Sequence, residues 1–129
     1  ADDGGWPPEV DIMEGRGQQP GDLVMTTHWR IPETQRVERC GFDFVVPDAP
    51  TAFHDYGVLW QPDRITYFID RMPVSEIKVP VGFHDPMYMI VNLAMGSKTL
   101  EGVGFVDGES PVTVAFEIDR VSAYQIDER

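Results

Sequence analysis

The sequence contains only one cysteine, Cys40, and few basic residues. A lone cysteine cannot form a disulfide within the chain, and its strand-like surroundings favour a small buried hydrophobic side chain. Ten lysines and arginines stand against 22 aspartates and glutamates, which gives a formal net charge of −12. This charge disfavours binding to nucleic acid or to an anionic membrane surface. We therefore expect neither class of partner.

Long apolar runs, internal repeats and low-complexity segments are also absent from the sequence. No run is apolar enough to span a membrane and no signal peptide is visible, so a mature secreted protein and an excised piece would look the same. Helical periodicity is missing, whereas 12 glycines and 11 prolines favour short strands and turns. With 129 residues, 42% of them hydrophobic, the chain can form at most one domain with a buried core.

The most informative stretch lies near the amino end and reads Gly-Gly-Trp-Pro-Pro-Glu-Val-Asp-Ile-Met-Glu-Gly-Arg-Gly. Glu9, Asp11 and Glu14 are separated by apolar residues, which predicts a strand with one acidic and one buried face. Strict alternation would place Met13 rather than Glu14 on the acidic face. A single β-bulge near Ile12 and Met13 absorbs the extra residue and returns Glu14 to that face. Without the bulge, Glu14 would point unpaired into the core, which is costly.

Three neighbouring carboxylates repel one another, and more than one role fits them. In a retaining glycosidase, two carboxyl groups stand about 5 Å apart, one ionised and the other protonated. A solvated acidic face or a metal site would explain the same residues. Trp6, just upstream, favours the first interpretation, because an aromatic face beside paired acids suits a sugar ring.

Residues 6–14, Trp-Pro-Pro-Glu-Val-Asp-Ile-Met-Glu, resemble the active-site strand of glycoside hydrolase family 16, which includes laminarinases, lichenases and bacterial exopolysaccharide glycanases. The resemblance implies that Glu9 is the nucleophile, Glu14 the general acid/base and Asp11 an assisting carboxylate. The spacing with the extra Met13 is that of the laminarinase-like branch. The implied activity is retaining endo-hydrolysis of β-1,3 and/or β-1,4 linkages in a glucan or bacterial exopolysaccharide.

Later parts of the chain agree with the family in the same order. The alternating pattern predicts strands over residues 23–29, 41–46, 56–60, 65–69 and 112–124, and a continuous apolar run with one asparagine predicts a strand buried on both faces over residues 86–97. In the family, a histidine beside the acids faces the cleft and an asparagine lies at the cleft edge, and His28 and Asn92 match these positions. We expect both to bind substrate, as well as Trp6 and Trp60. A structural hydrogen bond for His28, a structural amide for Asn92 and a scaffold role for Trp60 remain the alternatives.

The resemblance implies an all-β sandwich of jelly-roll type, of which residues 1–129 would be the C-terminal part. The family's catalytic domain is roughly twice as long, so we expect the N-terminal half on another chain, or removed, or replaced by a second copy in a self-paired dimer. Asp119 matches a family ligand for a structural calcium ion, although a solvated acid explains it equally well. No cofactor is expected for the chemistry, and the location should be secreted, extracellular or periplasmic. An inactive fragment or a non-catalytic carbohydrate-binding domain remains the alternative function.

Overall fold

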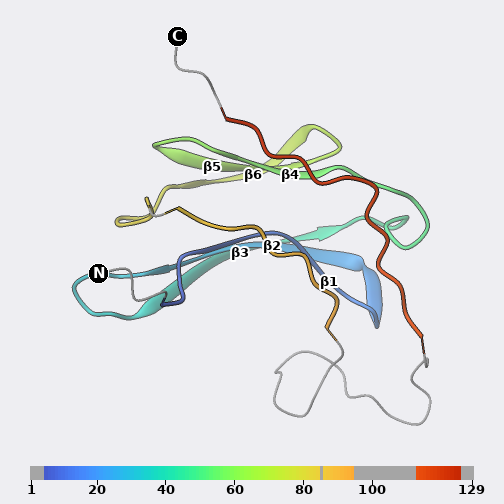
Figure 1. The fold of residues 1–129 in the computed structure, drawn as a ribbon, viewed down its shortest axis with the longest axis horizontal. Helices are drawn as coiled ribbons and strands as arrows, with labels where there is room; N and C mark the ends of the chain where they lie inside the picture. Colours follow the sequence, from blue (N-terminus) through green and yellow to red (C-terminus); the bar gives the residue numbers. More distant parts are fainter. Residues whose placement is uncertain (1–4, 85, 95–112, 126–129) are drawn as a thin grey trace. The chain divides into compact units, whose positions relative to one another are not determined.

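The computed structural model describes residues 5–84, 86–94 and 113–125 (Figure 1). The chain divides into two compact units, Ala1–Ile90 and Val91–Arg129. The first unit contains six strands: β1 Glu9–Arg16, β2 Gln19–Arg30, β3 Val37–Val45, β4 Tyr56–Trp60, β5 Arg64–Ile69 and β6 Met72–Lys78. They form two antiparallel sheets, ordered β1-β2-β3 and β4-β5-β6. The prediction of an all-β fold is therefore confirmed.

Among the described residues, no helix has the length and hydrophobicity to cross a membrane.

The first sheet alternates as the sequence predicts. Leu23 and Met25 on β2 are buried on one face, with exposed fractions of 6% and 0%. The pairing of β1 with β2 runs regularly to Asp11 opposite Thr26 and resumes with Glu14 opposite Val24. Two residues on β1 thus span the place of one on β2, which is the geometry of a β-bulge. The predicted bulge is confirmed.

The second sheet is built from two tight hairpins. The β5–β6 turn places Asp70 and Arg71 at φ angles of 49° and 66°, the left-handed region that paired hairpin turns require. Arg71 adopts this angle although glycine is favoured there. Asp70 ties the turn to the chain before β4: its carboxylate accepts a hydrogen bond from the Asp55 amide at 2.9 Å and lies 2.8 Å from Nδ1 of His54. These hydrogen bonds lower the pKa of Asp70, and the one between the two side chains raises the pKa of His54.

The buried core joins residues from both sheets of the first unit. Its fully buried members are Met25 from β2, Ile65 and Tyr67 from β5, and Phe83 after β6. One buried hydrogen bond of 2.6 Å links the Thr27 hydroxyl on β2 to the Tyr67 hydroxyl on β5. Burial raises the pKa of Tyr67 to about 12, so this hydroxyl keeps its proton at any physiological pH. The two sheets therefore form a sandwich with a polar link through its core.

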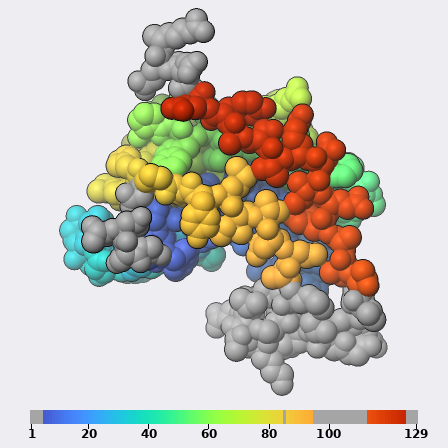
Figure 2. Space-filling view, in the orientation of Figure 1, coloured from blue at the N-terminus to red at the C-terminus, as the bar shows by residue number. Residues whose placement is uncertain are grey.

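The prediction of strands over 86–97 and 112–124 is wrong for the residues that the structure describes. Residues 86–94 and 113–125 are exposed and belong to no strand. The space-filling view of Figure 2 draws residues 113–125 in orange and red. A strand needs the backbone of a neighbouring strand for its hydrogen bonds, and none of the six strands pairs with these segments. Residues 95–97 and 112 lie outside the described part of the chain.

The hydrogen bond between Thr27 and Tyr67 gives a test of the sandwich. Replacing Tyr67 with Phe should lower the free energy of unfolding by about 1–3 kcal/mol, because the Thr27 hydroxyl is left buried without its partner. The matched control is Tyr88→Phe, since Tyr88 is 84% exposed. Urea denaturation of the native protein measures both. Equal effects of the two substitutions would contradict the buried link.

Candidate active site

The pairing of β1 with β2 decides which side chains share a face. Directly opposed residues of an antiparallel pair point to the same side of the sheet. Glu9, Asp11 and Glu14 are paired in turn with alternate residues of β2, namely His28, Thr26 and Val24. These alternate with the core residues Leu23 and Met25, so they face the other way. All three carboxylates therefore lie on the face opposite the core, as the predicted bulge requires.

Asp11 lies at the centre of this acidic face. Its Oδ2 is 3.3 Å from Nε2 of His28, and the two side chains are only 16% and 17% exposed. Its carboxyl group also shares a hydrogen bond with that of Glu9. The ligand atoms of Glu9, Asp11 and His28 all lie within 4.8 Å of one another. The structure thus brings His28 to the acids, as expected from its place on β2.

The surroundings of Asp11 favour its protonated form. Loss of solvent on burial is the largest cause, followed by the charges of Glu14 and Glu9, and together they raise the pKa of Asp11 to about 7. In its protonated form, the carboxyl group of Asp11 can donate a hydrogen bond to the carboxylate of Glu9. The raised pKa of Asp11 also makes stability depend on pH. The free energy of unfolding falls as the pH rises from about 4 to about 7, because Asp11 ionises less readily in the folded chain than in the unfolded chain.

Trp6 contacts the same group from the segment before β1. Its indole N–H donates a hydrogen bond to Oε2 of Glu9. Its ring centroid is 5.4 Å from that of His28, and the ring is 53% exposed. Trp6 thus combines an exposed aromatic surface with a hydrogen bond to the expected nucleophile. The sequence indicated the aromatic surface but not the hydrogen bond.

Arg30 is a residue that the sequence did not single out. Its guanidinium donates one hydrogen bond to the carbonyl oxygen of Trp6 and another, of 2.9 Å, to the carbonyl oxygen of Gln35. The only indication of this role in the sequence is the position of Arg30. It lies two residues after His28, so an extension of the β1–β2 pairing beyond Glu9 would reach it. Both hydrogen bonds depend on backbone geometry that sequence patterns do not reveal.

The other predicted site residues belong to neither β1 nor β2. Trp60 on β4 is paired with the buried Ile65 and packs edge-on against Phe83, with ring centroids 5.4 Å apart. It therefore faces the core of the sandwich, whereas the acids face away from that core. Asn92 and Asp119 belong to the second unit, where both are exposed and outside any strand.

Metal binding was one of the open interpretations of the acids. In the described ranges, a single set of three such side chains has ligand atoms close enough for one ion, formed by Glu9, Asp11 and His28. One imidazole and two carboxylates suit a transition metal better than calcium, which takes six to eight oxygen ligands. Asp119 is not part of this set, and its role as a calcium ligand stays a prediction.

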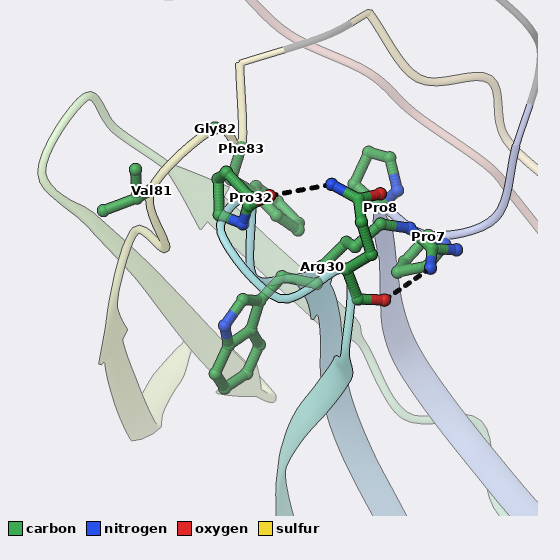
Figure 3. A pocket seen from close by; sticks show the side chains of 9 residues that line it. Pro7, Pro8, Arg30, Pro32, Val81, Gly82 and Phe83 are labelled. Carbon is green, nitrogen blue, oxygen red and sulfur yellow. Dashed lines mark hydrogen bonds between the residues drawn. The ribbon is translucent and has the colours of Figure 1, made fainter.

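A small cavity of about 230 Å³ lies beside the segment that carries Trp6 (Figure 3). It is lined by Pro7, Pro8, Trp29, Arg30, Pro32, Gln35, Val81, Gly82 and Phe83. Figure 3 shows hydrogen bonds that join Arg30, Gln35 and Pro32 at its edge. None of the three acids lines it, so the cavity is separate from the acidic face.

Three acids on one strand of an antiparallel sandwich indicate a candidate carbohydrate-active protein. The family model described as "Glycosyl hydrolases family 16" matches residues 2–107 of the chain. This match covers most of the chain and includes every member of the acidic face. The chain belongs to glycosyl hydrolase family 16.

Several relatives support the assignment. The chain is 38% identical over 128 residues to the endo-1,3-1,4-beta-glycanase ExsH of Rhizobium meliloti (strain 1021), covering 97% of this chain and 25% of the relative. The endo-1,3-1,4-beta-glycanase EglC of the same strain is 35% identical, with the same coverage. The chain thus spans a quarter of the length of these relatives. A glucan endo-1,3-beta-glucosidase of Cryptopygus antarcticus is 30% identical over 139 residues, covering 94% of this chain and 51% of the relative.

One solved structure shares the fold. It comes from work on endo-acting O-glycanases of the human gut microbiota that initiate mucin breakdown. It aligns with a TM-score of 0.52 and 28% identity, over 58% of this chain and 28% of the other. This likeness agrees with the jelly-roll type of β-sandwich predicted from the sequence.

The ionisation of Asp11 tests the shared acidic face. Carboxyl carbon NMR should show a titration midpoint near pH 7, far above the value of about 3.9 for an ordinary aspartate. Glu14→Gln should lower the midpoint, because one of the repelling charges is removed, while burial keeps it above the ordinary range. Asp63→Asn is the control. It changes an exposed residue just before β5 in the second sheet and should leave the titration midpoint of Asp11 unchanged. A midpoint near pH 4 in the native protein would contradict the described face.

Proposed function

We propose that this chain carries the catalytic carboxylates of a retaining endo-β-glycanase, with Glu9 as nucleophile and Glu14 as general acid/base. The observation that supports this most directly is the register of β1 on β2, because it puts Glu14 on the same face as Glu9 and Asp11. Retention needs two carboxyl groups about 5–5.5 Å apart on either side of the scissile bond. Two long side chains on one face, with the shorter Asp11 between them, are the residue types and order that this spacing calls for.

The proposed reaction has two steps. Glu9 attacks the anomeric carbon while Glu14 gives its proton to the leaving glycosidic oxygen, which forms a covalent glycosyl ester on Glu9. Glu14, now ionised, removes a proton from water, and the water attacks the anomeric carbon and releases Glu9. Asp11 assists in the first step, since its protonated carboxyl donates a hydrogen bond to Glu9 and orients that carboxylate for attack.

Substrate binding is proposed for the residues around this group. Trp6 offers an exposed ring beside Glu9, which suits stacking against a sugar face, and His28 can hydrogen-bond a sugar hydroxyl. Asn92 and Trp60 keep their proposed roles as substrate ligands on the family resemblance alone. Asp119 likewise remains a proposed ligand for a structural calcium ion.

The substrate class follows from the relatives' names. Two of them are called endo-1,3-1,4-beta-glycanases. We propose β-1,3 and/or β-1,4 linkages in a glucan or a bacterial exopolysaccharide as the bonds cleaved. Because such polymers lie outside the cell, the proposed location is secreted, extracellular or periplasmic. A second copy of the chain, or a separate chain with the rest of the domain, is the proposed protein partner.

Kinetics of two single substitutions test the assigned roles in the native protein. Glu9→Gln should remove nearly all turnover of barley β-glucan, because no nucleophile remains. Glu14→Gln should lower turnover of the polysaccharide by about 10²–10⁴-fold. It should slow formation of the ester from an aryl glycoside much less, because the acidic leaving group of that substrate needs no protonation. Glu38→Gln is the control. Glu38 lies on β3 and forms an ion pair with Arg36, and its replacement should change turnover little.

The same assay separates this proposal from metal binding. With calcium supplied in excess to keep the proposed structural site filled, a chelator selective for transition metals should leave the rate unchanged, since no step of the proposed reaction uses an ion. Loss of activity on chelation, restored by a divalent transition metal, would instead assign Glu9, Asp11 and His28 to a metal site. Substantial activity in Glu9→Gln would contradict the assignment of the nucleophile.

A further inference from the structure

We propose that Arg30 is a positioning residue for Glu9 and acts through Trp6. This inference rests on the proposed role of Glu9 as nucleophile. Three hydrogen bonds form a continuous chain: Gln35 carbonyl to Arg30 guanidinium, guanidinium to Trp6 carbonyl, and Trp6 indole to the Glu9 carboxylate. Each link joins segments that the sheet itself does not connect.

The segment that carries Trp6 needs such a support. Residues 5–8 precede β1 and belong to no strand, so the ladder of sheet hydrogen bonds begins only at Glu9. Arg30 is the last residue of β2, and continuing the pairing from Glu9 opposite His28 places it opposite Pro7. Proline has no N–H to donate to a neighbouring strand. The Arg30 side chain therefore supplies a contact to this segment where the backbone ladder cannot continue.

The other end of the support is held by a closed turn. Ile31 and Arg36 are joined by a backbone hydrogen bond of 2.9 Å, and the Gln35 amide donates to the Ile31 carbonyl at 2.8 Å. The Gln35 side chain also donates to the Pro32 carbonyl at 2.8 Å (Figure 3). The carbonyl oxygen that receives Arg30 is thus fixed in place by three local hydrogen bonds. A guanidinium that spans this turn and Trp6 transmits that rigidity toward Glu9.

The chemistry of arginine suits this task. A planar guanidinium can donate to two carbonyl oxygens at once in a fixed geometry, whereas a lysine ammonium is a flexible point charge. Arg30→Lys therefore keeps the charge and removes the two-point contact. The N–H of Trp6 in turn holds the Glu9 carboxylate by a hydrogen bond and limits its rotamers. Disturbing Arg30 should affect how well Glu9 is aligned for attack more than how tightly the polymer binds.

The first test does not depend on activity. In ¹⁵N-labelled native protein, the indole N–H of Trp6 should resonate downfield, as expected for a hydrogen bond to a carboxylate, and Glu9→Gln should move it upfield. Arg30→Lys should move the same resonance upfield, whereas Arg36→Ala, a change of the neighbouring exposed arginine, should not. An unchanged Trp6 resonance in Arg30→Lys overturns the proposal.

The second test uses kinetics on barley β-glucan. Arg30→Lys should lower kcat by about tenfold or more with a change in KM below about threefold, the pattern of a misaligned catalytic group. In a Trp6→Phe background, which lacks the indole N–H, Arg30→Lys should cost little more, because both residues act through one hydrogen bond. Fully additive losses, or an unchanged kcat in Arg30→Lys, overturn the proposal.

The two tests together separate this proposal from the proposed function. If Arg30→Lys shifts the Trp6 resonance while Glu9→Gln retains turnover, Glu9 is not the nucleophile and the catalytic part of the inference is overturned with it. If Glu9→Gln abolishes turnover while Arg30→Lys changes neither the resonance nor kcat, the proposed function stands and the role of Arg30 is overturned.

Discussion

The site depends on one irregularity in the pairing of β1 with β2. Between Asp11 and Glu14 the first strand has one residue more than its partner, and this bulge reverses the direction in which Glu14 would otherwise point. A regular strand with this sequence would bury Glu14 against the core and leave two acids on the other face. The bulge leaves one backbone position of β1 unpaired and adds Glu14 to the face that already carries Glu9 and Asp11.

Assembling those carboxylates has an electrostatic cost, which the neighbouring groups reduce in different ways. Burial and the charges of Glu14 and Glu9 raise the pKa of Asp11 to about 7, so Asp11 is only partly ionised near neutral pH. Trp6 donates to Glu9, and His28 lies 3.3 Å from Asp11. Below the acidic face, the buried Thr27 belongs to the same strand as His28 and is bonded to Tyr67 on the second sheet. The sandwich core thus holds in place the strand on which the site is built.

The sequence was a good guide where short-range patterns decide the structure. The bulge before Glu14, the hairpin of β4 and β5, and the strand that carries His28 all follow from alternation and turn residues. The pattern failed for residues 86–94 and 113–124, where an apolar run and apolar alternation predict strands but none of the described strands pairs with them. Alternation states which face a strand would bury, not whether a partner is present.

Contacts between side chains and distant backbone could not be predicted in the same way. Arg30 reaches the Trp6 carbonyl across 24 positions of sequence, and no motif marks that pairing. Trp60 carried an aromatic signal that suited substrate binding, yet its place opposite Ile65 turns it toward the core. Both cases depend on the register between strands, which sequence alone left open outside the acidic segment.

The most direct measurement of the central claim is to trap the covalent intermediate. The native protein would be incubated with an activated 2-deoxy-2-fluoro β-glucoside or β-laminaribioside, digested and sequenced by tandem mass spectrometry. The account predicts a single fluoroglycosyl ester on the peptide that contains residues 9–14, located at Glu9. An ester on Glu14, or turnover of the natural polymer with inverted anomeric configuration, would contradict it.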